Sequence, residues 1–163
     1  MQNKISKRLY MSERAGFTLV ELLLVIGIIA TLAVVVFVAL DPAKRFADSR
    51  DARRTSDAET ILSAVHQYII DNKGSAPALL PENVERTLGT GGAGCDNHTP
   101  ECDSSVGECL DLSGELAKYL KTIPFDPKDG SVEDTKYTIL KDNNGIITLK
   151  ACSAEGMPIT VSR

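Results

Sequence analysis

Three residues near the N-terminus suggest proteolytic processing followed by charge pairing: Gly16, Phe17 and Glu21. Gly16 has no side chain, so the backbone there can enter a narrow protease cleft and adopt unusual dihedral angles. Cleavage after Gly16 would create an α-amino group on Phe17, which is largely cationic at neutral pH because its pKa is about 8. Glu21 lies in an apolar stretch, where an ionisable group is costly and therefore a functional candidate. We expect the Phe17 amine of one chain to neutralise Glu21 of a neighbour and to fix the axial register between them. The alternative is an interfacial carboxylate near the helix N-terminus, favoured by the helix dipole, and the two roles are compatible.

Four cysteines form a second group of residues whose side chains could carry chemistry: Cys95, Cys102, Cys109 and Cys152. None belongs to a C-x-x-C pair, and their spacing does not match the common zinc patterns. In an exported domain we expect disulfides, and four cysteines permit three pairings, which the sequence leaves open. We favour one local bridge among the first three cysteines and one bridge from that loop to Cys152. A zinc site that includes His98 is the alternative.

The chain offers little support for catalysis. Residues 89–94 match the G-x-G-x-x-G pattern, but phosphate binding by this pattern requires a strand before it and a helix after it. Here only a short segment over residues 82–88 precedes the pattern, and Cys95-Asp96-Asn97 follows it, so we predict a flexible loop. No nucleophile–base pair, carboxylate pair or metal cluster stands out in the sequence, and we therefore predict that the protein is not an enzyme.

Gly16, Phe17 and Glu21 lie where a basic leader meets a long apolar run. Residues 1–16 contain four basic residues and one acidic residue, and the run from Leu22 to Leu40 is 19 residues long without a charge. A helix over residues 17–40 would span roughly 36 Å, enough to cross a hydrocarbon layer of ~30 Å. An ordinary signal peptide carries its small cleavage residues after the apolar region. Here Ala15-Gly16 precede it, so cleavage would release the leader and keep the apolar segment.

The ungapped string AGFTLVELLLVIG, residues 15–27, resembles the processing site of type IV prepilins and of type II secretion pseudopilins. The resemblance implies that a membrane-embedded prepilin peptidase cuts after Gly16 on the cytoplasmic side. It also implies that the same enzyme N-methylates Phe17, and that Glu21, the fifth residue of the mature chain, serves subunit assembly.

The resemblance further implies a structural subunit of a type IV pilus or a type II secretion pseudopilus. Such a chain is a single-pass membrane precursor that contacts lipid, with an extracytoplasmic head. It then joins a homo-oligomeric filament through a pilus or secretion assembly platform. The alternative is a minor pilin or membrane-anchored binding module for surface adhesion, DNA uptake or a secreted substrate. Outside a DNA-uptake pilus we expect no nucleic-acid partner, since the net charge is −4 and nucleic-acid binders are usually basic.

A looser resemblance covers the C-terminal part, where Tyr119-Leu120, residues 123–127 and Tyr137 are similar to pseudopilins of the major type. Some of those relatives hold calcium in a C-terminal loop. Four acidic residues here offer hard oxygen ligands: Asp126, Asp129, Glu133 and Asp134. Their spacing is not that of an EF-hand, so we prefer a solvated acidic turn and expect no cofactor.

The apolar segment continues into an amphipathic one over residues 41–74. Apolar residues recur there at helical spacing, at positions 58, 61, 62, 65, 68 and 69. We predict one helix from about residue 17 to about residue 72, bent near Pro42 and stopped by Asn72-Lys73-Gly74. The charges of residues 44–59 alternate in sign, which predicts a solvated helix face.

The remaining residues, 75–163, predict a small head: a loop over 75–112, a short helix over 113–122 and an antiparallel sheet over 135–162. Two strands are expected at 137–140 and 146–149, with a turn at 142–145, and residues 158–161 could add a third, in a sheet of two to four strands. The resulting fold class is α+β, with a long N-terminal helix against a small antiparallel sheet, as in pilins.

Overall fold

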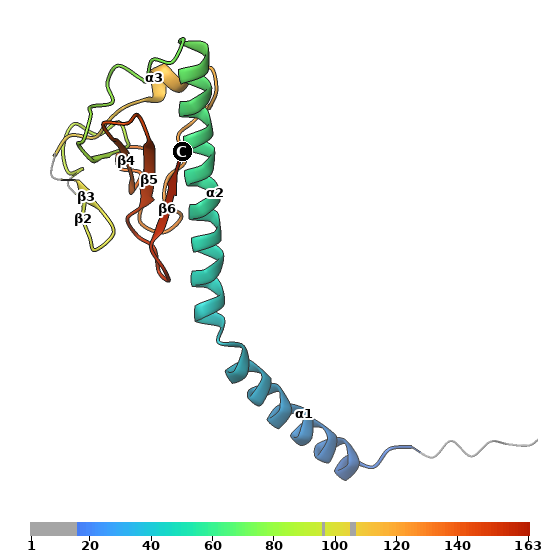
Figure 1. The fold of residues 1–163 in the computed structure, drawn as a ribbon. Helices are drawn as coiled ribbons and strands as arrows, with labels where there is room; N and C mark the ends of the chain where they lie inside the picture. Colours follow the sequence, from blue (N-terminus) through green and yellow to red (C-terminus); the bar gives the residue numbers. More distant parts are fainter. Residues whose placement is uncertain (1–15, 96, 105–106) are drawn as a thin grey trace, which may run out of the picture. The chain divides into compact units, whose positions relative to one another are not determined.

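The computed structural model describes residues 16–95, 97–104 and 107–163. The leader predicted over residues 1–16 lies outside the described residues, except for Gly16. The chain divides into two compact units, one ending at Pro42 and one beginning at Ala43. Figure 1 shows the order of the elements along the chain.

The first unit contains one helix, α1 (Leu19–Leu40), in which no residue is buried. It is long and apolar enough to cross a membrane. A helix satisfies its own backbone hydrogen bonds, as a lipid environment requires. The hydroxyl of Thr31, one of its few polar side chains, donates to the carbonyl of Ile28 at 2.8 Å.

The helical segment is interrupted at Asp41, which adopts a left-handed conformation with φ of +38°. The next helix, α2 (Pro42–Asp71), begins directly after it. Proline lacks an N–H and its ring clashes with the preceding turn, so it suits the first position of a helix and not the interior. The predicted single helix is therefore two helices, with the break at the residue before Pro42.

The second unit is built on α2, whose predicted apolar stripe is confirmed. Ala58, Ile61, Leu62 and Val65 are buried, while Tyr68 and Ile69 are partly buried. The helix ends at the predicted stop, where the N–H of Gly74 donates to the carbonyl of Ile69 at 2.8 Å with a φ of +92° at the glycine. This is the left-handed C-terminal cap that favours glycine.

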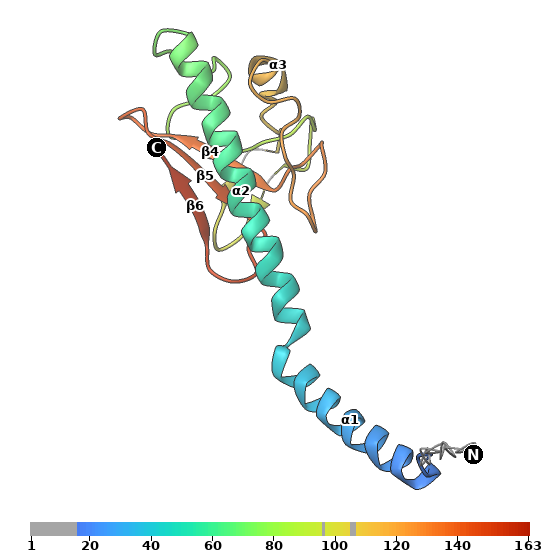
Figure 2. The ribbon, with the colours of Figure 1, turned by 90° about the vertical axis from the view of Figure 1, so that its right-hand side faces the viewer.

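Four strands form an antiparallel sheet in the order β1-β4-β5-β6. They are β1 (Arg86–Thr87), β4 (Tyr137–Lys141), β5 (Ile147–Ala151) and β6 (Ile159–Ser162). The two expected strands are confirmed, with their turn at Asp142–Gly145 and a φ of +83° at Gly145, and the third strand is present as β6. Strand β1 was not expected, since it lies within the predicted loop. Figure 2 shows the sheet beside α2.

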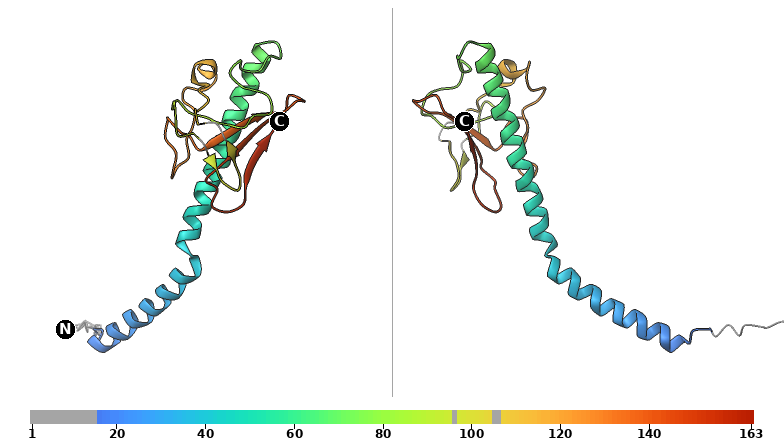
Figure 3. Two further views of the ribbon diagram at one scale, coloured as in Figure 1. Left: turned by 90° about the vertical axis from the view of Figure 1, so that its left-hand side faces the viewer. Right: turned by 45° about the vertical axis from the view of Figure 1, so that its right-hand side comes forward.

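The core of the head lies between α2 and one face of the sheet (Figure 3). On β5, residues alternate between buried and partly exposed, so Ile147, Leu149 and Ala151 face inward. Tyr137 and Ile139 of β4 are buried beside them. This layer of helix on sheet confirms the predicted α+β fold.

The helix predicted over 113–122 is much shorter, since α3 spans only Ser113–Leu116. The N–H groups of Tyr119 and Leu120 both donate to the carbonyl of Leu116, at 2.8 and 2.9 Å. This shared acceptor tightens the chain into a turn. The tightening directs Tyr119 toward α2, where its ring meets Tyr68 edge-on and its hydroxyl donates to Asp71 at 2.8 Å.

The glycine-rich stretch is not a loose loop, which corrects the predicted flexibility. The N–H groups of Thr90 and Gly91 donate to the carbonyls of Val132 and Glu133 at 3.1 and 2.9 Å. A Cβ at Gly89 would lie 2.2 Å from the Glu133 carbonyl oxygen, so only glycine permits this approach. Nearby, β2 (Asn97–His98) and β3 (Asp103–Ser104) form a small antiparallel pair.

Candidate processing and assembly site

The predicted cleavage point lies in extended chain just before α1. Gly16 and Phe17 are exposed, and the Phe17 side chain has 84% of its surface accessible. A Cβ placed on Gly16 would meet no described atom within 4 Å. Among the described residues, none covers Gly16 or Phe17, and no described contact requires glycine at position 16.

Glu21 takes part in a reciprocal capping arrangement at the start of α1. The hydroxyl of Thr18 accepts the backbone N–H of Glu21 at 3.3 Å. In return, Oε2 of Glu21 accepts the N–H and the hydroxyl of Thr18 at 2.8 and 2.9 Å. A side-chain carboxylate here satisfies an otherwise unpaired donor and complements the positive end of the helix dipole. Both bonds end on Oε2, and no described residue donates to Oε1.

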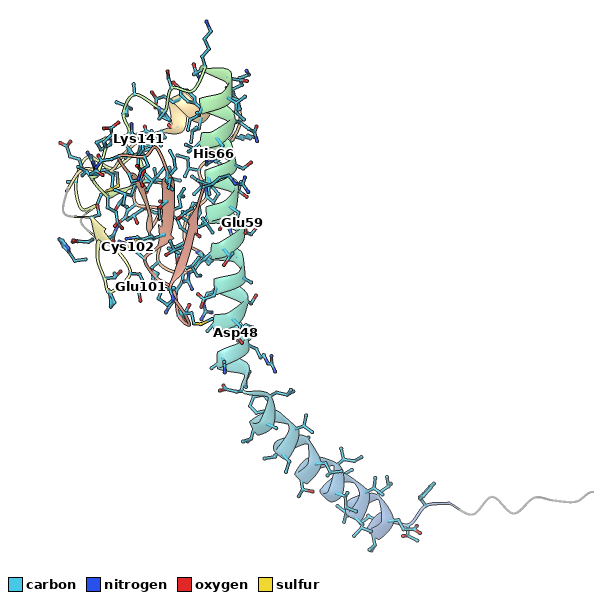
Figure 4. The ribbon with its side chains drawn as sticks, in the orientation of Figure 1. Asp48, Glu59, His66, Glu101, Cys102 and Lys141 are labelled. Carbon is cyan, nitrogen blue, oxygen red and sulfur yellow. A yellow bond between two sulfur atoms is a disulfide. The ribbon has the colours of Figure 1, made fainter. Side chains whose placement is uncertain are left out.

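The rest of α1 is an apolar surface with no cover in the described part of the chain. Glu21 is its only charged residue, and the side chains of leucine, isoleucine, valine and phenylalanine are exposed on every side (Figure 4). Exposed apolar surface of this extent is unfavourable in water and marks contact with lipid or with other protein. Two environments can cover the apolar surface of α1: a lipid bilayer, or a bundle of similar helices.

The head is attached to α2 through a buried charge network. The other charged residues of 44–59 are exposed or partly exposed, as predicted for a solvated face, and Arg54 is the exception. Arg54 is fully buried and donates from Nε to Asp126 Oδ2 at 2.6 Å, while a second nitrogen reaches Asp126 Oδ1 at 3.1 Å. Its remaining nitrogen donates to Asp51 at 2.8 Å and to Glu155 at 3.1 Å. These four charged groups come from α2, from the turn after Pro124 and from the loop after β5.

Glu155 is the outer member of this network. Arg50 donates two hydrogen bonds to its carboxylate, both at 2.6 Å. These bonds lower the pKa of Glu155 to about 2, against a smaller opposing effect of burial and with further help from Arg54. Burial raises the pKa of the Asp126 carboxyl, but the guanidinium of Arg54 and the N–H groups of Lys128 and Asp129 outweigh it, so that the pKa is lowered.

Two of the four carboxylates suggested for calcium have other partners among the described residues. The carboxylate of Asp126 is occupied by Arg54, and Asp134 pairs with Lys136 at 2.6 Å. Asp129 contributes its backbone N–H to Asp126, and not its carboxylate. Within the described residues, no group of three His, Cys, Asp or Glu side chains is arranged to hold a metal ion. The predicted solvated turn is also corrected at Asp126, which is buried.

The four cysteines form two disulfides, Cys95–Cys109 and Cys102–Cys152. The first closes a local loop, and the second ties that loop to the residue after β5. All four thiols are used, so no thiolate remains for the alternative zinc site. The side chain of His98 instead contacts Asp103 at 3.2 Å.

Two sets of residues in the head were missed by reasoning from the sequence. Arg54 lies four residues before Ala58 and seven before Ile61, on the same helix face as the apolar stripe, so its burial could have been read from the spacing. Asn97 contacts Asp134 and Lys136, which are almost forty positions away in the sequence. No local sequence pattern predicts this contact.

Comparison with known protein families identifies the N-terminal segment. Residues 11–37 match the model of the prokaryotic N-terminal methylation motif, which is the signature of prepilins and pseudopilins. No curated protein and no solved structure gives a significant match to the chain. The motif is the one that prepilins carry, and the α+β fold is consistent with that of a pilin. More particularly, the motif supports a subunit of the type IV pilin or pseudopilin type.

Proposed function

We propose that this protein is a structural subunit of a type IV pilus or of a type II secretion pseudopilus. It is cleaved after Gly16, N-methylated at Phe17 and assembled through α1. The observation that carries the proposal is the combination of Gly16 and Phe17, which no described residue covers, with a following helix that has no buried residue. A chain that exposes such a helix needs first lipid and then sister helices to cover it.

Before assembly the precursor lies in the cell membrane as a single-pass protein, with α1 in the bilayer and the head on the extracytoplasmic side. Two disulfides in the head fit an oxidising compartment. Its partners are the prepilin peptidase, the assembly platform and other copies of the chain. Its role is that of a building block and not of a catalyst.

Glu21 is the residue that we assign to assembly. Its Oε2 caps its own helix, which leaves Oε1 to accept from the methylated amine of Phe17 in an adjacent subunit. Inside a bundle of apolar helices an unpaired charge is costly, so each amine favours the one axial position that places it at a carboxylate.

The mature N-terminus tests the proposal. We expect mass spectrometry of the chain from cells that contain a prepilin peptidase to show a start at Phe17 with one added methyl group. Gly16→Val should abolish processing. The matched variant Gly27→Val should leave processing intact, since a Cβ at either glycine meets no described atom within 4 Å. A wild-type chain that still begins at Met1 would refute the proposal.

A further inference from the structure

Three side chains of the head converge outside the processing site and outside the Arg54 network. The amine Nζ of Lys136 donates to Oδ1 of Asn97 at 2.8 Å and to Oδ2 of Asp134 at 2.6 Å. The amide Nδ2 of Asn97 donates to Oδ1 of Asp134 at 3.3 Å. The Asp134 carboxylate therefore contacts both the Lys136 amine and the Asn97 amide, and these two groups also contact each other.

The orientation of the Asn97 amide is set by its partners. Lys136 can only donate, so it faces the amide oxygen, and an ionised Asp134 can only accept, so it faces the amide nitrogen. The nitrogen also donates to the hydroxyl of Thr87, a fully buried residue of β1, at 3.0 Å. Asn97 itself is 6% exposed, so its amide is held in one place.

The backbone of Lys136 is also fixed in position. It adopts a left-handed conformation with φ of +61°, which is uncommon for a residue with a long side chain. Its N–H donates to Oδ1 of Asp134 at 3.0 Å, and its carbonyl accepts the N–H of Cys152 at 3.0 Å. These backbone contacts thus keep the Lys136 amine beside the Asn97 amide.

We propose that Lys136 and Asn97 become joined by an intramolecular amide bond, with Asp134 as the proton carrier. The lysine amine transfers a proton to Asp134 and attacks Cγ of Asn97, so that a new Nζ–Cγ bond forms. Nζ contacts Oδ1 at 2.8 Å, and Cγ lies one carbonyl bond, about 1.2 Å, beyond that oxygen, so the attack requires Nζ to leave the hydrogen bond and approach Cγ over the face of the amide.

The bond that breaks is Cγ–Nδ2. Asp134 protonates Nδ2, which leaves as ammonia, and the carboxylate accepts the second proton released by the lysine nitrogen and passes it to solvent. No electrons are transferred, so the step needs no oxidant and no further reactant. The side chains of Lys136 and Asp134 are 26% and 18% exposed.

The product would be a third covalent tie in the head. It would connect β2 to the start of β4 across 39 residues of sequence, beside the disulfide Cys102–Cys152. Unlike the two disulfides, it would survive reduction. A filament subunit bound in this way would keep the loop around β2 attached to the sheet in a reducing environment.

The intact mass of the wild-type chain, reduced and denatured, tests the proposal. We expect a loss of one ammonia, about 17 Da, relative to the mass that the sequence and the N-terminal processing require. Peptide mapping with trypsin should show no cleavage after Lys136 and a branched peptide that joins it to Asn97. A full mass with normal cleavage after Lys136, or an ammonia loss located at other residues, would overturn the cross-link.

Three variants separate the cross-link from an ordinary ion pair. Lys136→Arg keeps the charge and Asp134→Asn keeps the shape, and both should have the full mass. Lys150→Arg is the matched control, since this lysine pairs with Glu85 at 2.7 Å and contacts no side-chain amide among the described residues. It should retain the loss of ammonia. The same loss in Lys136→Arg would also contradict the proposal.

Discussion

Arg54 and Asp126 form a two-pronged ion pair in which both side chains are fully buried, with one contact at 2.6 Å and the other at 3.1 Å. The two residues are 72 positions apart, one on α2 and the other in the turn that leads toward β4. A charge pair of this geometry is directional, so it fixes both the rotation and the height of α2 against the head.

Removal of the arginine should be strongly destabilising. In Arg54→Met the carboxylate of Asp126 stays buried without its cation, and breaking a buried pair in this way costs about 3–5 kcal/mol. The adjacent variant Arg53→Met is the control, because Arg53 is 61% exposed and exposed pairs contribute about 0–1 kcal/mol. Urea unfolding of the full chain in detergent, followed by near-ultraviolet circular dichroism, measures both. Equal losses would show that the pair does not hold α2.

The head should lose stability in acid through Glu155. Its ordinary pKa of 4.5 is lowered to about 2 in the fold, primarily by the hydrogen bonds from Arg50. A lowered pKa means that the carboxylate stabilises the fold above pH 4.5, and that this contribution disappears as the pH falls toward 2. Thermal unfolding between pH 7 and pH 2 should therefore show a weaker acid dependence in Glu155→Gln. Glu82→Gln, at an exposed carboxylate, should leave the wild-type dependence.

The two disulfides should contribute unequally. Cys102–Cys152 spans 50 residues and Cys95–Cys109 spans 14. Chain entropy predicts that loss of the longer link costs more, by about 1 kcal/mol. Double replacement of each pair by alanine, followed by denaturant unfolding, measures the difference. A larger loss from the shorter loop would show that the contacts of Cys95 outweigh the entropy of closure.

The glycine-rich stretch offers a test of close packing. Gly89→Ala should cost about 1–3 kcal/mol, as overpacking does, since the new Cβ would lie 2.2 Å from the backbone oxygen of Glu133. Gly92→Ala is the matched control, because a Cβ there meets no described atom within 4 Å. The difference between their unfolding midpoints reports the clash. If both variants kept wild-type stability, the contact between the loop and residues 132–133 would be excluded.

The helices and strands whose apolar residues repeat at a regular spacing could be predicted from the sequence. The stripe on α2 repeats every three or four residues, and β4 and β5 flank an Asp-Asn-Asn-Gly turn, so these elements have local signals. Strand β1 has only two residues and pairs with β4 far along the chain, which leaves no local pattern. The length of α3 was overestimated because the contact of Tyr119 with Tyr68 and Asp71, and not helix propensity, decides how the chain turns there.

The same division applies to the functional residues. Gly16, Phe17 and Glu21 lie within one short motif, so they could be named as candidates without coordinates. The partners of Asp126 could not, because a carboxylate in a polar turn has the same local sequence whether it faces water, a metal ion or a buried arginine. Only the tertiary position of Arg54 decides between these environments.

Substitutions at Thr18 and Glu21 can separate the two roles of Glu21. As a cap it works together with Thr18, whose hydroxyl accepts the N–H of Glu21 at 3.3 Å. As an assembly residue it works with the amine of another chain. Thr18→Val removes the hydroxyl but keeps the backbone N–H that donates to Glu21, so it should cost the helix start about 1 kcal/mol.

If Glu21 served only as a cap, Thr18→Val and Glu21→Gln would impair filament formation to a similar degree. We expect instead that Glu21→Gln abolishes filaments while cleavage at Gly16 continues, and that Thr18→Val still assembles. The reason is that a glutamine can accept a hydrogen bond at the helix start but carries no charge to neutralise the methylated amine in an apolar bundle. Electron microscopy of sheared filaments, with mass spectrometry of the N-terminus, measures both steps. Normal filaments in Glu21→Gln would refute the pairing with Phe17.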